Sequence, residues 1–191
     1  MDIENSDALI VVDVQNDFCP GGALAVEDGD RVVAPLNRLI PKFKHCVFSR
    51  DWHPKDHCSF AGEPEFVDKS WPAHCVAHTH GAEFHPDLNV PDNARVVSKA
   101  TTSEKEAYSA FDATNLAREL RDHGVKRVFV GGLATDYCVK STVLDALAAG
   151  FDVVLLTDAC RGVDNPPGSG AEAIEEMRQA GASLRQSAEL T

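Results

Sequence analysis

The chain has 191 residues, of which 43% are apolar and 25% are charged. This is the size and composition of one ordinary domain with its own core, so we expect a single domain over residues 1–191. Thirty acidic residues against 18 basic ones give a net charge of −12, which disfavours nucleic acid and anionic lipid as partners. The apolar runs are far shorter than the roughly 18 residues that span a bilayer, and the acidic N-terminal stretch is unlike a secretory signal. We therefore expect a cytoplasmic protein.

Short apolar runs alternate with helix-like segments along the chain. The runs expected to form strands are 8–12, 45–48, 95–98, 127–130, 151–156 and a short one at 182–184. The segments expected to form helices are 30–43, 115–123, 136–149 and 169–180. Continuous apolar runs are typical of strands buried on both faces of a parallel sheet. The alternation therefore predicts an α/β fold.

The segment 51–93 departs from this alternation because it shows no helical or strand periodicity. It nevertheless contains six of the eight histidines, both tryptophans and five of the ten prolines. A loop of this length inside a domain is typically functional or disordered, and its aromatic content argues against disorder. We expect three of its histidines, His78, His80 and His85, to be solvated.

Reactive side chains follow four of the predicted strands. Asp13 follows the first, Asp51 and His53 the second, Lys99 the third, and the segment 131–138 the fourth. Because the carboxyl ends of parallel strands meet at one edge of the sheet, we expect these groups to lie together. The sequence therefore predicts a site with an acid, a cation, a thiol and metal-ligand residues.

Cys138 is the candidate nucleophile. It begins the helix that follows the fourth strand, where the helix dipole and free N–H groups favour a thiolate. Asp13 can accept the thiol proton and Lys99 can stabilise both groups. The backbone N–H groups of Ala134 and Cys138 could bind an oxyanion. Each residue alone also has an ordinary structural interpretation, so the hypothesis depends on all three side chains meeting at one edge.

Asp51 and His53 are candidate metal ligands because residues at i and i+2 of an extended segment point to one side. His57 and His74 are the nearest further donors. A mixed carboxylate and histidine set with open positions suits a catalytic zinc, iron or manganese ion. The alternative is that these are ordinary surface residues. The clustering of histidines argues against that interpretation.

Several motifs resemble the nicotinamidases of the isochorismatase-like cysteine hydrolase superfamily, over about residues 7–185. The matching segments are 12–18, 49–57, 71–75, Lys99, 108–111 and 132–138. The first and last are shared across the superfamily, whereas the Asp-Trp-His, Trp-Pro-x-His-Cys and Tyr-Ser-Ala-Phe elements resemble nicotinamidases in particular. The resemblance implies a three-layer α/β/α, Rossmann-like fold with a mainly parallel six-stranded sheet.

The resemblance also implies roles for individual residues. They are a catalytic triad of Asp13, Lys99 and Cys138, oxyanion donors at Ala134 and Cys138, metal ligands Asp51, His53 and His74, and substrate contacts Phe18, Trp71, Leu133, Tyr137 and Tyr108. Some members add a histidine at the position of His57, while others use water, and both alternatives stay open. The metal is a divalent ion, zinc in the first place, with iron or manganese as alternatives. A cis peptide is expected between Leu133 and Ala134.

The implied reaction is hydrolysis of nicotinamide to nicotinate and ammonia through a cysteine thioester, as a step of NAD salvage. Pyrazinamide, an isostere, is expected to be accepted as well. Other readings are a hydrolase of another small amide or ureide, an isochorismatase, which would need no metal site, and a noncatalytic metal-binding or thiol redox protein. A homo-oligomer is compatible with the sequence.

Overall fold

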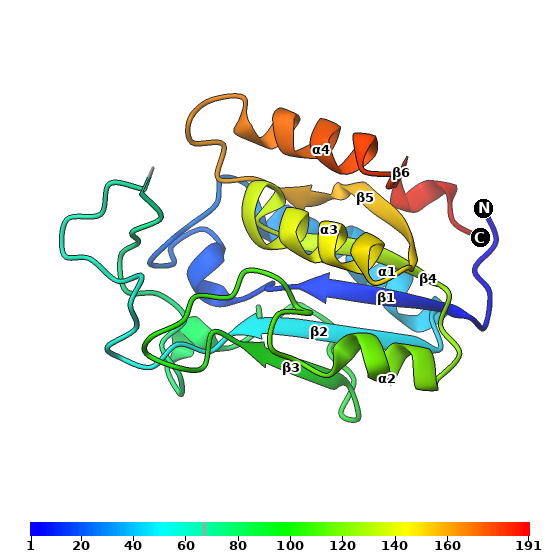
Figure 1. The fold of residues 1–191 in the computed structure, drawn as a ribbon, viewed down its shortest axis with the longest axis horizontal. Helices are drawn as coiled ribbons and strands as arrows, with labels where there is room; N and C mark the ends of the chain where they lie inside the picture. The colour runs from blue at the N-terminus through cyan, green and yellow to red at the C-terminus, as the bar shows by residue number, and fades with distance from the viewer. Residues whose placement is uncertain (67) are drawn as a thin grey trace.

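The computed structural model describes residues 1–66 and 68–191, and Val67, in the 51–93 segment, lies outside the described residues. Six parallel strands form one sheet in the order β3-β2-β1-β4-β5-β6 (Figure 1). They are β1 (Asp7–Val12), β2 (His45–Asp51), β3 (Arg95–Lys99), β4 (Arg127–Leu133), β5 (Asp152–Arg161) and β6 (Ser183–Arg185). The predicted α/β class and parallel sheet are confirmed.

Helices cover both faces of the sheet, so the fold has three layers (Figure 1). The helices are α1 (Val33–Leu39), α2 (Leu116–Asp122), α3 (Lys140–Ala148) and α4 (Ser169–Gln179). Leu9 and Val11 of β1 belong to the core beneath α1, whereas Ala8 and Ile10 belong to the core beneath the other three helices. Successive residues of a strand point to opposite faces, which explains why the apolar run is continuous.

Two predicted helices have a different structure at their ends. The segment 30–43 contains the short helix α1 between two 3₁₀ turns, Gly29–Val32 and Ile40–Lys42. Pro41 has no N–H to continue the α-helical bonding, so the helix ends before it. The segment 136–149 begins in a single π-helical turn, Thr135–Val139, and only then continues as α3.

The strand order reverses at β1, which lies between β2 and β4. In open parallel sheets, ligands bind beyond the carboxyl ends of the strands at such a switch point. The long segment after β2 is bridged at Phe84 to Gln15, which follows β1, and it is bridged within itself between His53 and Val76. One of these bridges joins the long loop to the segment that follows β1, and the other joins two parts of the loop.

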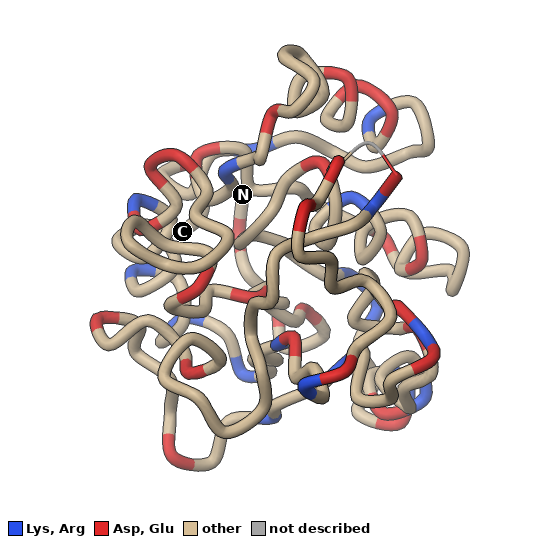
Figure 2. The backbone as a smooth tube through the Cα atoms, turned by 90° about the vertical axis from the view of Figure 1, so that its left-hand side faces the viewer, with Lys and Arg blue, Asp and Glu red and all other residues tan. Residues whose placement is uncertain are grey.

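In the part of the chain that the structure describes, no helix has both the length and the apolar character needed to cross a membrane. Figure 2 looks onto the carboxyl ends of the strands and shows acidic positions on all sides of the outline, with basic positions between them. The net charge of −12 is thus spread around the molecule in this view.

Candidate active site and metal centre

Lys99 lies at the centre of a buried group of reactive side chains. It is the last residue of β3 and pairs in register with Asp51, the last residue of β2. Its Nζ donates to Asp51 Oδ1, lies 2.9 Å from Asp13 Oδ2 and lies 3.3 Å from Cys138 Sγ. Although burial opposes its charge, the two carboxylates raise the pKa of Lys99 well above its usual value. The ammonium group is therefore charged and contacts both acids and the thiol.

Asp13 directly follows β1, with a backbone φ of 48°. Its side chain is completely buried, and its Oδ1 accepts a 2.7 Å hydrogen bond from the hydroxyl of Ser49. Burial raises the pKa of Asp13 to about 6, and Lys99 limits that rise. Near neutral pH the carboxylate is thus ionised yet basic enough to accept a proton.

Cys138 lies on the π-helical turn between β4 and α3. Burial raises the pKa of its thiol well above the usual value, although Lys99 opposes this. This differs from the expectation that the helix dipole would favour a thiolate, because burial and the two nearby carboxylates outweigh the positive groups. The thiol is neutral at rest and needs a base to become a nucleophile.

The turn that contains Cys138 begins at a cis peptide between Leu133 and Ala134, as the resemblance implies. The carbonyl of Ala134 accepts the N–H groups of Tyr137 and Val139, both at 3.1 Å, which fixes the turn against the end of β4. Ala134 and Cys138 both line the same cavity. Their backbone is thus placed beside any group bound there.

Asp51, His53 and His74 form a buried cluster whose potential ligand atoms lie within 4.8 Å of one another. The carbonyl of Ala100 lies 3.3 Å from His53 Nδ1 and the carbonyl of Pro72 lies 2.8 Å from His74 Nδ1, so both Nδ1 atoms carry hydrogen as donors. In the neutral rings, Nε2 then keeps its lone pair.

Two further observations fit a cation at this cluster. The Nε2 atom of His53 is buried and has no hydrogen-bond partner among the described residues, which is costly unless a ligand occupies it. Burial lowers the pKa of His74, which keeps that ring neutral as metal binding requires. Asp51 belongs to both groups, because Lys99 holds Oδ1 while Oδ2 lies 3.7 Å from His53 Nε2.

His57 lies next to this cluster but is engaged elsewhere. Its Nε2 donates to the carbonyl of Lys105 at 3.2 Å, and its Nδ1 accepts the hydroxyl of Ser59 at 2.8 Å. A neutral histidine has a single lone pair on its ring, and Ser59 already uses it. His57 groups with His53 and Glu106 rather than with Asp51 and His74. The geometry therefore leaves His57 without a free lone pair that could bind the cation.

A small cavity of about 30 Å³ adjoins the thiol and the metal cluster. Its lining residues are Phe18, Leu24, Asp51, Trp71, His74, Tyr108, Ala134, Tyr137, Cys138 and Val163. The indole N–H of Trp71 donates to the hydroxyl of Tyr108 at 3.1 Å, and the rings of Trp71 and Tyr137 meet edge to face at 4.9 Å. These walls suit a flat aromatic ring.

The structure changes the expected lining in two ways. Leu133 is fully buried in the core beneath α1 and is not among the residues that line the cavity. Leu24 and Val163 line it instead, from loops without periodicity, so no sequence signal marked them. Of the other loop histidines, His78 and His80 are exposed as expected, whereas His85 is half-buried.

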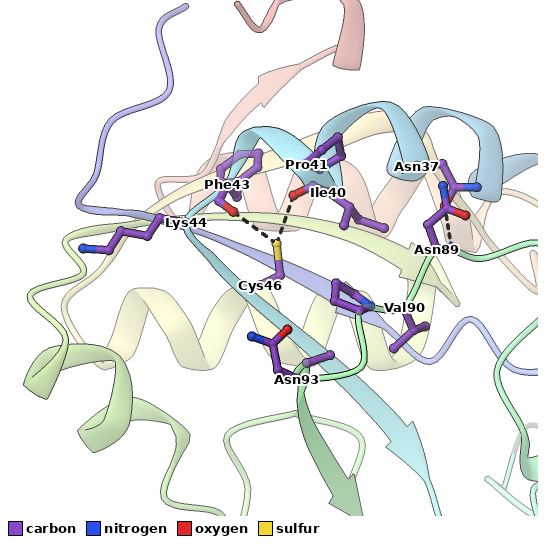
Figure 3. A pocket seen from close by; sticks show the side chains of 11 residues that line it. Asn37, Ile40, Pro41, Phe43, Lys44, Cys46, Asn89, Val90 and Asn93 are labelled. Atoms are coloured by element: carbon purple, nitrogen blue, oxygen red, sulfur yellow. Dashed lines mark hydrogen bonds between the residues drawn. The ribbon is translucent and has the colours of Figure 1, made fainter.

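A wider hollow of about 600 Å³ lies at the opposite end of the sheet, near the start of β2 (Figure 3). There the thiol of Cys46 donates to the carbonyls of Ile40 and Phe43 at 3.4 and 3.8 Å. Asn37 bonds to the backbone of residues 87 and 89. The polar groups named are thus bonded within the protein, and the reactive side chains lie at the other end of the strands.

Fold and site together define a class, an α/β protein with a hydrolase-type site at the carboxyl ends of its strands. The chain belongs to the isochorismatase domain family, whose model matches residues 7–189.

Individual relatives are similar over nearly the whole chain. The nicotinamidase of Escherichia coli is 45% identical over 198 residues, covering 93% of each chain. The pyrazinamidase of Pyrococcus horikoshii in complex with zinc is 48% identical, with a TM-score of 0.85 over 95% of this chain and 99% of that one. PnC1 of L. infantum in complex with nicotinate is 37% identical, with a TM-score of 0.88 over 98% and 96%.

Proposed function

We propose that the chain is a nicotinamidase, a cation-dependent amidohydrolase that converts nicotinamide to nicotinate and ammonia. The observation that carries the proposal is the contact of the Cys138 thiol with Lys99 Nζ at 3.3 Å, beside the basic carboxylate of Asp13 and an aromatic-walled cavity. The similarity to a nicotinamidase, a zinc-bound pyrazinamidase and a nicotinate complex supports the choice of substrate. Pyrazinamide is expected as a second substrate.

The cation in this proposal is zinc, held by Asp51, His53 and His74. Bound there, it would supply a Lewis acid that helps to orient the substrate. The protein does the rest of the orientation, because Phe18 and Trp71 form the walls of the cavity.

In the first half of the proposed reaction, Asp13 accepts the thiol proton of Cys138 as sulfur attacks the amide carbon. The N–H groups of Ala134 and Cys138 donate to the oxyanion that forms. Lys99 remains charged and lowers the cost of placing negative charge on the sulfur. Asp13 then gives its proton to the departing nitrogen, and the C–N bond breaks. Ammonia departs, and the acyl group remains on Cys138 as a thioester.

In the second half, Asp13 accepts a proton from water as the water oxygen attacks the thioester carbon. The C–S bond breaks, the sulfur regains the proton from Asp13, and nicotinic acid is released, which gives its carboxyl proton to solvent to form nicotinate. Asp13 thus serves as base and acid in turn, which suits a carboxyl group whose pKa is about 6.

The test is ammonia release from nicotinamide by the purified protein, by Cys138→Ala and by chelator-treated protein. We expect Cys138→Ala to lose at least about 10³-fold in kcat because the nucleophile is gone. Chelation should raise KM, and added zinc should restore it.

The matched control is Cys46→Ala, which removes a thiol at the opposite end of β2 from Asp51 and should leave turnover unchanged. Wild-type protein that binds zinc but releases no ammonia from nicotinamide or pyrazinamide would refute the proposed substrate. Undiminished turnover by Cys138→Ala would refute the nucleophile.

A further inference from the structure

The turn formed by residues 13–18 contacts both halves of the metal cluster through side chains that the reaction does not use. We propose that Gln15 and Asp17 are positioning residues, each of which fixes the backbone of one metal-ligand segment. This inference rests on the proposed cation site at Asp51, His53 and His74.

Gln15 holds the backbone of Asp51 from both sides. Its Nε2 donates to the carbonyl of Asp51, and its Oε1 accepts the N–H of the same residue, both at 2.8 Å. The second hydrogen of Nε2 goes to the carbonyl of Ala82 at 2.9 Å. The regular pairing of β1 with β2 ends at Val12 and Ser49, so the amide of Gln15 continues it with a side chain. Gln15 is completely buried, so water offers no replacement for these bonds.

Asp17 holds the other half of the cluster. Its Oδ2 accepts the N–H of Cys75, the residue after His74, at 2.7 Å, and its Oδ1 accepts the N–H of Ala23 at 3.1 Å. The carboxylate packs closely on Gly81, where an added Cβ would lie 2.0 Å from Oδ2. Asp17 thus ties the His74 segment to the same turn that carries Gln15.

The two ligand segments are also bonded to each other. The N–H of His53 donates to the carbonyl of Cys75 at 3.1 Å, and the N–H of Ala77 donates to the carbonyl of His53 at 2.8 Å. Hydrogen bonds therefore join each pair of three segments: the 13–18 turn, the end of β2 and the His74 segment. Loss of either side-chain contact should let one ligand move relative to the others.

The test is zinc affinity of the full chain after metal removal, measured by competition with a fluorescent chelator in the absence of substrate. We expect Gln15→Met and Asp17→Asn to weaken zinc binding by about 10- to 100-fold, the usual effect of losing outer partners of metal ligands. After zinc saturation, kcat should stay near the wild-type value while KM rises at limiting zinc. Asp17→Ala should lose more zinc affinity than Asp17→Asn, because the asparagine keeps one acceptor oxygen.

Asn16→Ala is the matched control. Asn16 belongs to the same turn and donates to the carbonyl of His80 at 2.8 Å, but that bond reaches no ligand segment. If Gln15→Met fails to fold, Gln15→Glu, which keeps an acceptor for the Asp51 N–H, replaces it. Wild-type zinc affinity in the folded Gln15 and Asp17 variants overturns the inference and leaves the proposed function standing. No zinc binding by the wild type overturns the cation site and the inference together.

Discussion

The ammonium group of Lys99 balances the negative charges of Asp13 and Asp51. It is the one ammonium group in a buried set with two carboxylates and a thiol. Removing one partner of such a set is costly because it leaves an uncompensated charge away from water. The set therefore keeps Asp51 ionised for a cation while Asp13 retains enough basicity to take a proton.

The first prediction concerns the acid limb of the pH profile. Asp13 has a pKa of about 6, so kcat/KM should fall below about pH 6, where the protonated acid can no longer accept the thiol proton. The hydroxyl of Ser49 bonds the charged form, so its loss in Ser49→Ala should raise the pKa of Asp13. We expect the limb to move up by about 0.5–1 pH unit, from the usual net value of one hydrogen bond. A limb that stayed in place or moved to lower pH would argue against Asp13 as the base.

The second prediction separates the neighbouring histidines. Because Ser59 uses the lone pair of His57, His57→Ala should keep zinc affinity within about threefold of the wild type. His53→Ala should lose zinc by a factor of about 100 or more, since it removes a direct ligand. Equal losses in the two variants, measured by metal content after dialysis, would make His57 a ligand after all.

At the scale of elements, the end of β4 is shaped by its contact with β1. Gly132 has a φ of 134°, and a Cβ added there would lie 2.0 Å from the carbonyl oxygen of Val12. The register between β4 and β5 also shifts between Val130 and Gly132. The strand that leads to Cys138 can therefore adopt this path only with a glycine at its irregular position.

The third prediction compares two glycines with positive φ. Gly132→Ala should lower the free energy of unfolding by at least about 3 kcal/mol, because backbone must move to admit the methyl group. Gly150 has a φ of 85°, but a Cβ added there would meet nothing within 4 Å. Gly150→Ala should therefore lower the free energy of unfolding by about 1 kcal/mol, from the backbone conformation alone. If urea unfolding gave the two variants a similar loss of unfolding free energy, the contact of Gly132 with β1 would be unimportant.

Much of the fold and the site could be predicted because strand ends in a parallel sheet converge. Asp13, Asp51, Lys99 and Cys138 meet as the element order requires. The protonation of Cys138 could not be predicted, since it depends on burial that no local pattern encodes. Leu24 and Val163 were missed for a similar reason, because they reach the cavity from loops whose course is set by tertiary contacts.

At the scale of the whole molecule, the site joins distant parts of the chain, so a cation bound there should stabilise the fold. Zinc at 100 times its Kd adds about 2.7 kcal/mol if it binds only the native state. For a domain of this size, that corresponds to a rise in Tm of roughly 5–10 °C. His74→Ala should lose most of this rise in a calorimetric scan. A full rise in that variant would place the zinc elsewhere.

The position of the cavity beside the thiol governs what meets the acyl group during the proposed reaction. The cavity adjoins Cys138 and is walled by aromatic side chains, so a group released from the bound amide lies beside the sulfur. In the proposed reaction, ammonia is released next to the thioester, and its rate of escape competes with its return to the acyl group. In high external ammonia, the protein would accordingly exchange the amide nitrogen of its substrate as well as hydrolyse it.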